Sequence, residues 1–362
     1  MDACVSRLAG HRILVTGGSG FIASHLAEAL VEKNQLVLFD TGFAMRPVGF
    51  TSLLGHPNVQ AMTGDVMAAD QVRRAADGCD VVIHAAAMVG VQNVIRHPRK
   101  TIEVNFMGTR NVLEAIPEPR KLHRFLYFST SEVFGGMSFR VDESRSTSVG
   151  SVNEARWSYS IAKLAGEHLV SAYHRELGLP SVIVRPFNVF GPRRVGDHAV
   201  LQFILRALQG QDIEVHGDGS QIRSWCYIDD FVDALVRCLE KTEAVGEDFN
   251  LGNPQNTCTI LDLAYRVVAL AGSKSAVKFT HIDFSDIDLR VPKLTKSATM
   301  LGFEPRWGLD RALRAAIEWY RNNTVMLAEG LSVGHEPLDR ASRSSANGRA
   351  RALVSEGKAL AS

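Results

Sequence analysis

One short pattern near the N-terminus constrains the fold of this chain more than any other feature. Ile13 to Val15 form an apolar run that ends in the glycine-rich segment Thr16 to Gly20, and the apolar residues after it recur with helical spacing. The pattern predicts a buried strand, a tight turn and a helix in direct succession. Such a unit is the usual start of a parallel sheet whose faces are covered by helices.

Further apolar runs repeat this alternation along the chain. Each run is short and gives way to a stretch with helical spacing or to turn residues. We predict three more buried strands and then a fifth and a sixth, at Leu36 to Phe39, Val59 to Met62, Val81 to Ile83, Phe125 to Phe128 and Ser181 to Val184. The alternation predicts a doubly wound parallel α/β sheet of the Rossmann type.

The spacing becomes irregular in the second half of the chain, where prolines punctuate shorter elements. We expect a Rossmann domain over residues 1–180, to which part of 181–250 returns, and a smaller mixed α/β substrate-binding lobe over 181–324. Residues 325–362 consist largely of Ala, Ser, Gly and Arg without aromatic residues, so we expect a disordered tail there.

Composition excludes several classes of partner. Lys plus Arg (40) balance Asp plus Glu (39), so the chain has no bulk charge that favours nucleic acid or an anionic membrane. The five cysteines are scattered without CxxC pairs, which argues against a structural metal or a disulfide framework. No run approaches the roughly 18 apolar residues of a membrane helix. We therefore expect a cytoplasmic protein without a metal.

The glycine-rich turn is suited to a dinucleotide. Gly17 and Gly20 allow the backbone to approach a pyrophosphate, whose charge is stabilised by the free N–H groups of the following helix. Asp40 closes the next predicted strand about 20 residues on, where a carboxylate binds the adenosine ribose and repels a 2′-phosphate. The spacing therefore favours NAD over NADP. Asp65 follows the third strand and either meets the adenine edge or is an ordinary surface-turn aspartate.

A tyrosine and a lysine supply the reacting centre. Tyr159 and Lys163 are four residues apart in a helical pattern, so both project from one face. A neighbouring ammonium and the positive nicotinamide of NAD both favour the phenolate, which takes a proton from a hydroxyl as hydride leaves the same carbon. Ser131 follows the fifth strand at its carboxyl end and would hydrogen-bond the oxygen that is oxidised.

The segments TGGSGFIAS, GDV, HAAA, NFMGT, STSEVFG, YSIAK and RPFNVFGP resemble, in order, the signature segments of extended short-chain dehydrogenases that act on nucleotide sugars. The resemblance runs from about Ile13 to Tyr320, and one departure is Ala23, where the family usually has a third glycine. It implies a UDP-sugar substrate and a homodimer formed by the helices of the Asn105 and Tyr159 segments. It also implies that the residues around NAD include Phe21, Ile22, Val66, Ala85, Ala86, Ala87, Asn105, Tyr159 and Lys163.

Within that family, the residues around Ser131 and Tyr159 favour a decarboxylase. Glu132 can handle a second proton, which simple 4-epimerases do not need, and Thr130 flanks Ser131 as a further substrate contact. Arg156 stands where decarboxylases of UDP-glucuronate carry an arginine, and it could pair with a substrate carboxylate. Dehydratases and epimerases usually have an aspartate after the family's diphosphate arginine, here Arg223, whereas this chain has Ser224.

The resemblance completes the predicted site with two residues. Arg290 matches the family's late arginine on the diphosphate, and Asn188 lies in the loop at the uracil side of the cleft. We predict that Tyr159 is the base, Ser131 its hydrogen-bond partner, and Glu132 with Arg223 the proton-handling pair.

The predicted reaction proceeds through a 4-keto sugar and converts UDP-glucuronate to UDP-xylose or to the 4-keto pentose. A nucleotide-sugar 4,6-dehydratase, a UDP-glucuronate 4-epimerase and a non-catalytic NAD-binding regulator are the alternatives.

Overall fold

The computed structural model describes residues 8–43, 50–281 and 287–323 of the chain. The segment predicted to be a disordered tail, 325–362, lies outside the described residues.

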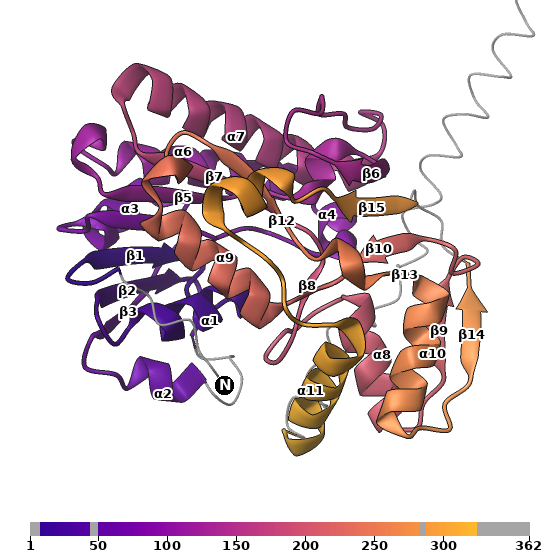
Figure 1. Cartoon of the computed structure of the whole chain (residues 1–362). Helices are drawn as coiled ribbons and strands as arrows, with labels where there is room; N and C mark the ends of the chain where they lie inside the picture. The colour runs from indigo at the N-terminus through magenta and orange to yellow at the C-terminus, as the bar shows by residue number, and fades with distance from the viewer. Residues whose placement is uncertain (1–7, 44–49, 282–286, 324–362) are drawn as a thin grey trace, which may run out of the picture.

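A seven-stranded sheet forms the centre of the molecule (Figure 1), with the strand order β12-β7-β5-β4-β1-β2-β3 and every pairing parallel. The strand order reverses direction between β1 and β4. Open α/β sheets bind ligands at such a reversal. The doubly wound Rossmann-type fold is therefore confirmed. The strands are β1 (Arg12–Thr16), β2 (Gln35–Asp40), β3 (Val59–Thr63), β4 (Val81–His84), β5 (Arg124–Phe128), β7 (Ser181–Pro186) and β12 (Asp248–Leu251).

Helices cover both faces of this sheet. On one face, α1 (Phe21–Leu30) and α9 (Ile228–Glu240) bury a large apolar core against the strands. On the other face, a second core is formed by α3 (Ala69–Ala76), α6 (Gly108–Glu114) and α7 (Ser158–Leu177). The strands between the two cores are therefore apolar almost throughout.

The prediction of a buried strand at Val59 to Met62 was wrong in one respect. The strand exists as β3, but its residues are partly or fully exposed. The reason is its position at the edge of the sheet, where β2 is its neighbour on one side only. A short apolar run does not reveal whether a strand lies at the centre or the edge.

A second, four-stranded sheet has the order β13-β10-β15-β6 and lies on the right in Figure 1. Its strands come from distant parts of the chain, since β6 precedes the Tyr159 helix and β12 of the main sheet follows β10. The two predicted domains are thus interleaved in sequence, and their boundary stays a prediction. The strands are β6 (Met137–Val141), β10 (Ile222–Ser224), β13 (Thr257–Thr259) and β15 (Leu289–Pro292).

Shorter elements complete the structure around this sheet. The pairs are β8 (Val189–Phe190) with β11 (Cys226–Tyr227), and β9 (Ile213–His216) with β14 (Val277–Thr280). The helices on this side are α8 (Ala199–Leu208), α10 (Ile260–Ala271) and α11 (Leu309–Asn322).

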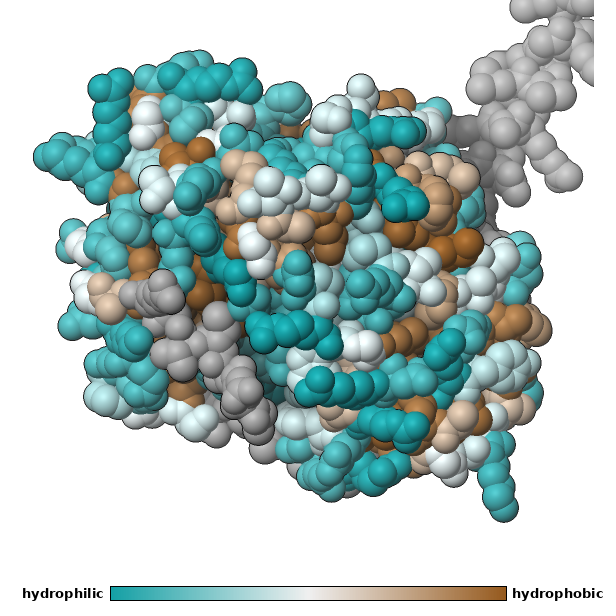
Figure 2. Space-filling model, viewed as in Figure 1, coloured by the Kyte–Doolittle hydropathy of each residue, from teal (hydrophilic) through white to brown (hydrophobic). Residues whose placement is uncertain are grey.

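The remaining elements are short helical segments, and three of them carry residues predicted for the site, namely Asn105, Ser131 and Arg156. The segments are α2 (Phe50–Leu54), α4 (Val91–Arg96), α5 (Pro98–Ile102), η1 (Glu103–Met107), η2 (Pro119–Lys121), η3 (Ser131–Phe134), η4 (Ala155–Trp157), η5 (Thr242–Ala244), η6 (Pro254–Asn256) and η7 (Ser297–Leu301). On the face shown in Figure 2, hydrophobic residues lie in several small groups separated by hydrophilic ones.

Candidate active site

The glycine loop joins β1 to α1 in a conformation that excludes side chains. Gly17 has a φ of 69°, and its N–H donates to the Phe39 carbonyl of β2 at 2.8 Å. A Cβ on Gly17 would lie only 2.8 Å from Cα of Ala86, and a Cβ on Gly20 only 2.9 Å from the Gly17 carbonyl oxygen. Phe21 and Ile22 then open α1. The loop therefore brings bare backbone to the positive end of a helix, as a pyrophosphate requires.

The two predicted aspartates lie at neighbouring strand ends. The Asp40 carboxylate accepts from the N–H groups of Ser19 and Gly42, each at 3.1 Å, so it is held beside the glycine loop. An ionised carboxylate has about four acceptor positions, which leaves it able to accept from ribose hydroxyls. The Asp65 carboxylate accepts from the Met67 N–H at 2.9 Å, which is the contact of a surface-turn aspartate.

The segment after β4 packs against the glycine loop. The N–H groups of Ala85 and Ala86 donate to the carbonyl and hydroxyl of Thr16 at 3.2 and 3.3 Å. Asn105, fully buried, holds this segment through a pair of hydrogen bonds with the backbone of Met88, at 2.8 and 3.0 Å. Asn105 therefore shapes the wall of the site. Val66 is also buried, and Ala87 continues the same segment.

Lys163 and Tyr159 are separated by one turn of α7, as predicted, but each has a different environment. The ammonium of Lys163 donates to the Phe128 carbonyl at 2.7 Å, and burial lowers its pKa to about 7. Burial and the neighbouring Glu132 carboxylate raise the pKa of the Tyr159 phenol, which a hydrogen bond from Thr130 opposes in part. Tyr159 thus holds its proton until a cation or ligand changes this balance.

Glu132 lies at the centre of a cluster of buried charges. Its carboxylate accepts two hydrogen bonds from the Arg156 guanidinium, at 2.7 and 3.1 Å, and one from the Ser160 hydroxyl at 3.3 Å. The Arg290 guanidinium approaches to 3.6 Å. Burial alone would raise the pKa of this carboxyl, but Arg290 and Arg156 outweigh it and lower the pKa below its usual value. Glu132 is therefore ionised.

This cluster differs from the predicted arrangement in two respects. Arg156, predicted to contact a substrate carboxylate, lies in the 3₁₀ turn η4 directly before α7 and pairs with Glu132. The arginines that contact Glu132 are Arg156 and Arg290, whereas Arg223 donates to the Ile222 carbonyl at 3.1 Å. Arg223 and Arg290 are nonetheless register partners on β10 and β15, so the small sheet places them side by side.

The remaining predicted residues line the approach to this cluster. Ser131 is buried at the carboxyl end of β5, and the Thr130 hydroxyl accepts from the Glu132 N–H at 3.1 Å. Asn188, in the left-handed region with a φ of 42°, donates to the Ser224 carbonyl at 2.9 Å. Asn188 therefore links the turn after β7 to the strand that carries Arg223.

Sequence reasoning missed a buried ion pair beneath these strand ends. Glu167 accepts two hydrogen bonds from Arg185, at 2.8 and 2.6 Å, and one from the Ser129 hydroxyl. Glu167 lies four residues after Lys163, a spacing that could have indicated it. The pair fixes the end of β5 just before Thr130 and Ser131.

The residues present fit NAD. The bare glycine loop, the carboxylate of Asp40 beside it and the phenol of Tyr159 would hold the pyrophosphate, the adenosine ribose and the nicotinamide end respectively. Among the residues that the structure describes, no group of three His, Cys, Asp or Glu side chains could hold a metal ion. No helix in the described ranges is long and apolar enough to cross a membrane.

Comparison with known proteins identifies the family of the chain. Residues 13–252 match the NAD dependent epimerase/dehydratase family. The chain belongs to this family. Its members are NAD-dependent, and the chain accordingly takes NAD as its cofactor.

Two curated relatives and one solved structure place the chain within the family. It is 34% identical to a UDP-N-acetyl-alpha-D-glucosaminuronate decarboxylase of Bacillus cytotoxicus, over 86% of this chain and 98% of that one. It is 32% identical to UDP-glucuronic acid decarboxylase 1 of Danio rerio, over 85% of this chain and 72% of that one. A UDP-glucuronic acid 4-epimerase from Bacillus cereus, in complex with UDP-glucuronic acid and NAD, superposes with a TM-score of 0.78 at 30% identity, covering 86% and 99% of the two chains. The resemblance to nucleotide-sugar enzymes is confirmed.

Proposed function

We propose that this protein decarboxylates a UDP-linked uronate, UDP-glucuronate in the first instance, through a 4-keto sugar. The observation that carries the proposal is the Glu132 carboxylate held between Arg156 and Arg290, next to Ser131 and Tyr159. An epimerase that only removes and returns hydride has no need of a second proton-handling group, whereas a decarboxylase has to protonate a carbon.

Oxidation at C4 depends on Tyr159 and Ser131. NAD, when bound, supplies the hydride acceptor and the positive charge that lowers the pKa of the phenol. Tyr159 then takes the proton of the C4 hydroxyl, and Ser131 donates a hydrogen bond to the oxygen that becomes the ketone. Lys163 donates to the Phe128 carbonyl one turn along α7 from Tyr159, and in its protonated form it adds positive charge to this end of the site.

The ketone at C4 makes the C5 carboxylate a β-keto acid. The bond from C5 to the carboxylate carbon breaks, carbon dioxide leaves, and the electron pair forms an enolate that positive groups stabilise. Arg223 and Arg290 supply such charge from neighbouring strands. Glu132 is ionised in this cluster, so it takes up a proton from solvent water and passes that proton to C5 as the enolate collapses. Return of hydride gives UDP-xylose, and early release gives the 4-keto pentose.

The substrate carboxylate has to bind in a site that already contains the Glu132 carboxylate. Because Arg156 already binds Glu132 through two hydrogen bonds, an incoming carboxylate meets a paired guanidinium. The Bacillus relative acts, by its name, on an N-acetylated uronate. We therefore include UDP-N-acetylglucosaminuronate as the second candidate substrate.

Product analysis tests the proposal. Purified protein is incubated with NAD and either UDP-glucuronate or UDP-N-acetylglucosaminuronate, and the products are weighed by mass spectrometry. Loss of carbon dioxide supports the proposal. Loss of water would indicate a dehydratase, and an unchanged mass with a new retention time an epimerase. No reaction with any nucleotide sugar would favour a regulator.

We also propose a homodimer in the cytoplasm. Ile102, Met107 and Leu177 are about two-fifths exposed on adjoining helical segments, at 40%, 41% and 44%, and burying such side chains favours association. Light scattering after gel filtration would give the mass of two chains, and Met107→Lys should shift it towards one. Fractionation of cells that express the protein tests the proposed cytoplasmic location.

A further inference from the structure

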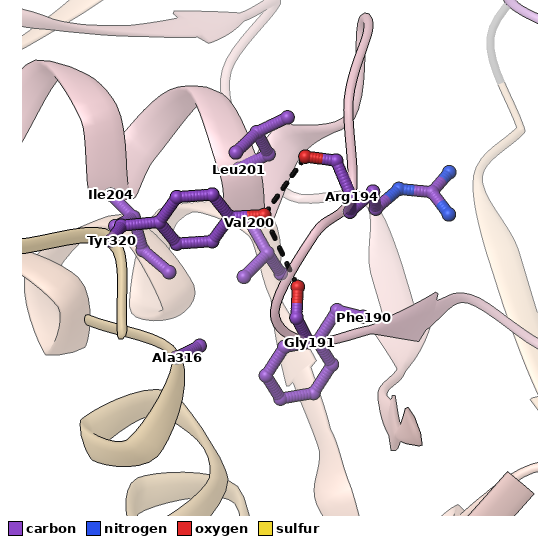
Figure 3. A pocket seen from close by; sticks show the side chains of 8 residues that line it. All are labelled: Phe190, Gly191, Arg194, Val200, Leu201, Ile204, Ala316 and Tyr320. Atoms are coloured by element: carbon purple, nitrogen blue, oxygen red, sulfur yellow. Dashed lines mark hydrogen bonds between the residues drawn. The ribbon is translucent and has the colours of Figure 1, made fainter. Parts of the chain in front are cut away.

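The loop between β8 and α8, residues 191–198, is fixed from two sides. The Tyr320 hydroxyl of α11 donates to the carbonyls of Gly191 and Arg194, at 3.2 and 2.9 Å, as Figure 3 shows. On the other side, His25 of α1 contacts the Pro192 carbonyl at 3.1 Å. The loop therefore spans the gap between the helix that follows the glycine loop and the last described helix.

Two consecutive arginines in this loop have different environments. Arg193 adopts a φ of 65°, which is unusual for a side chain other than glycine, and its guanidinium binds both carboxylate oxygens of Glu28 on α1. Strained backbone of this kind persists where the surroundings fix it, and it is frequent at functional sites. The ion pair accounts for Arg193 but leaves Arg194 to be explained.

The guanidinium of Arg194 lies over the ring of Phe21, 5.3 Å from its centroid. Phe21 is the first residue of α1, directly after the glycine loop. Figure 3 shows the side chain directed away from Tyr320. Within the described ranges, Nε of Arg194 is buried without a hydrogen-bond partner, and no carboxylate forms an ion pair with the guanidinium.

This placement is unfavourable without a ligand. A guanidinium whose Nε is buried without a partner is already costly, and the N-terminus of α1 adds a positive partial charge of about half a unit. Burial lowers the pKa of Arg194 to about 10, and the phenols of Tyr320 and Tyr159 oppose this in part. An anion at the end of α1 would relieve the repulsion.

We propose that Arg194 binds the diphosphate of NAD at the N-terminus of α1. Of the two phosphate-bearing ligands, NAD and the proposed UDP-sugar, the position of Arg194 favours the dinucleotide. It stacks on the helix that receives the cofactor, whereas the arginines predicted for the sugar-nucleotide diphosphate, Arg223 and Arg290, lie on the small sheet. The proposal does not depend on which reaction follows, because it concerns the cofactor alone.

Binding measurements on full-length protein freed of nucleotide test this proposal. Arg194→Met keeps much of the contact with Phe21 and removes the charge, and Arg194→Lys restores the charge. We expect Arg194→Met to weaken NAD and ADP-ribose roughly ten- to a hundredfold in calorimetry, with Arg194→Lys between it and the parent. Affinity for adenosine, which lacks phosphate, and for UDP should stay the same.

A matched control is Arg311→Met. The Arg311 guanidinium also stacks on an aromatic ring, 4.0 Å from the centroid of Trp307, but its partner lies outside the glycine loop and α1. NAD affinity should not change in this variant. Unchanged NAD affinity in Arg194→Met, an equal loss for adenosine, or a loss for UDP alone would each overturn the proposal.

Thermal unfolding gives a second readout that separates binding from structure. Without nucleotide, Arg194→Met should have a Tm no lower than the parent, because it loses a partly buried charge that has no ion-pair partner in the described structure. The rise in Tm on adding NAD should be smaller. A lower Tm without nucleotide, combined with an unchanged rise on adding NAD, would show that Arg194 only stabilises the fold.

Discussion

On the side of the small sheet, the Glu132 carboxylate lies between the guanidinium groups of Arg156 and Arg290. On the side of the glycine loop, Lys163 contacts the Phe128 carbonyl and the Tyr127 ring, and Arg194 contacts the face of Phe21. Neither cation forms an ion pair within the described residues. Buried charges that are paired are organised before any ligand arrives, whereas unpaired ones are costly until it does. The sugar side is therefore preorganised, and the cofactor side depends on its ligand for stability.

The largest effect is expected from Glu132→Gln. If the paired cluster handles the second proton, release of carbon dioxide from UDP-glucuronate should fall roughly a hundred- to ten-thousandfold, while NAD affinity stays the same. The control is Glu154→Gln, a nearby exposed glutamate that accepts from the Trp157 indole at 3.0 Å. Undiminished release of carbon dioxide would remove Glu132 from the mechanism.

The same variant should also lower stability in the absence of any ligand. Removing the charge leaves two buried arginines without their carboxylate, and breaking a buried pair costs about 3–5 kcal/mol in free energy of unfolding. Urea titration with circular dichroism would measure it. Glu154→Gln should differ from the parent by less than about 0.5 kcal/mol. Equal stability of both variants would mean that the sugar side is not preorganised by this pair.

A smaller effect is expected from Gly17→Ala on the cofactor side. The added Cβ meets the Ala86 backbone at 2.8 Å in a backbone conformation that side chains disfavour. Strain of about 1–3 kcal/mol should weaken NAD roughly five- to a hundredfold. UDP binding, measured by calorimetry, should not change. An equal loss of affinity for NAD and for UDP would contradict the division of the site into a cofactor side and a sugar side.

A last effect is a dependence of stability on pH. Burial lowers the pKa of Lys163 from its ordinary 10.5 to about 7, so between these values the unfolded chain binds a proton that the folded chain has lost. Stability without NAD should therefore rise with pH across that window. Lys163→Met lacks this contribution. The difference in free energy of unfolding between the parent and this variant, measured by urea titration, should therefore change with pH. If the stabilities of the two proteins changed with pH in parallel, the lowered pKa of the buried Lys163 would be contradicted.

The contrast between the two sides also explains what the sequence could predict. The glycine loop and the Tyr159–Lys163 pair are local patterns, because a turn and a helix bring neighbours in sequence together. The contacts of Glu132 with Arg156 and Arg290 join segments that are 24 and 158 residues apart in the sequence. They depend on how β15 and β6 pair, which no periodicity reveals.

The strands outside the six predicted ones escaped prediction for a related reason, and β6 and β12 are two examples. β6 is mostly exposed and joins the small sheet, and β12 is only four residues long and returns to the main sheet after a long excursion. Neither has the long apolar run of a central parallel strand. The edge position of β3 was equally hidden, since only the completed strand order shows which strands have one neighbour.

The Tyr320 hydroxyl has a consequence for the biosynthesis of the protein. Because domains tend to fold from the N-terminus as the ribosome adds residues, the glycine loop and its sheet can begin to form early. The loop that presents Arg194, however, receives two of its hydrogen bonds from a residue near the end of the described chain. A nascent or shortened chain that stops before residue 320 would therefore display the nucleotide-binding strands without a fixed Arg194, and it should acquire tight cofactor binding only when α11 has been made.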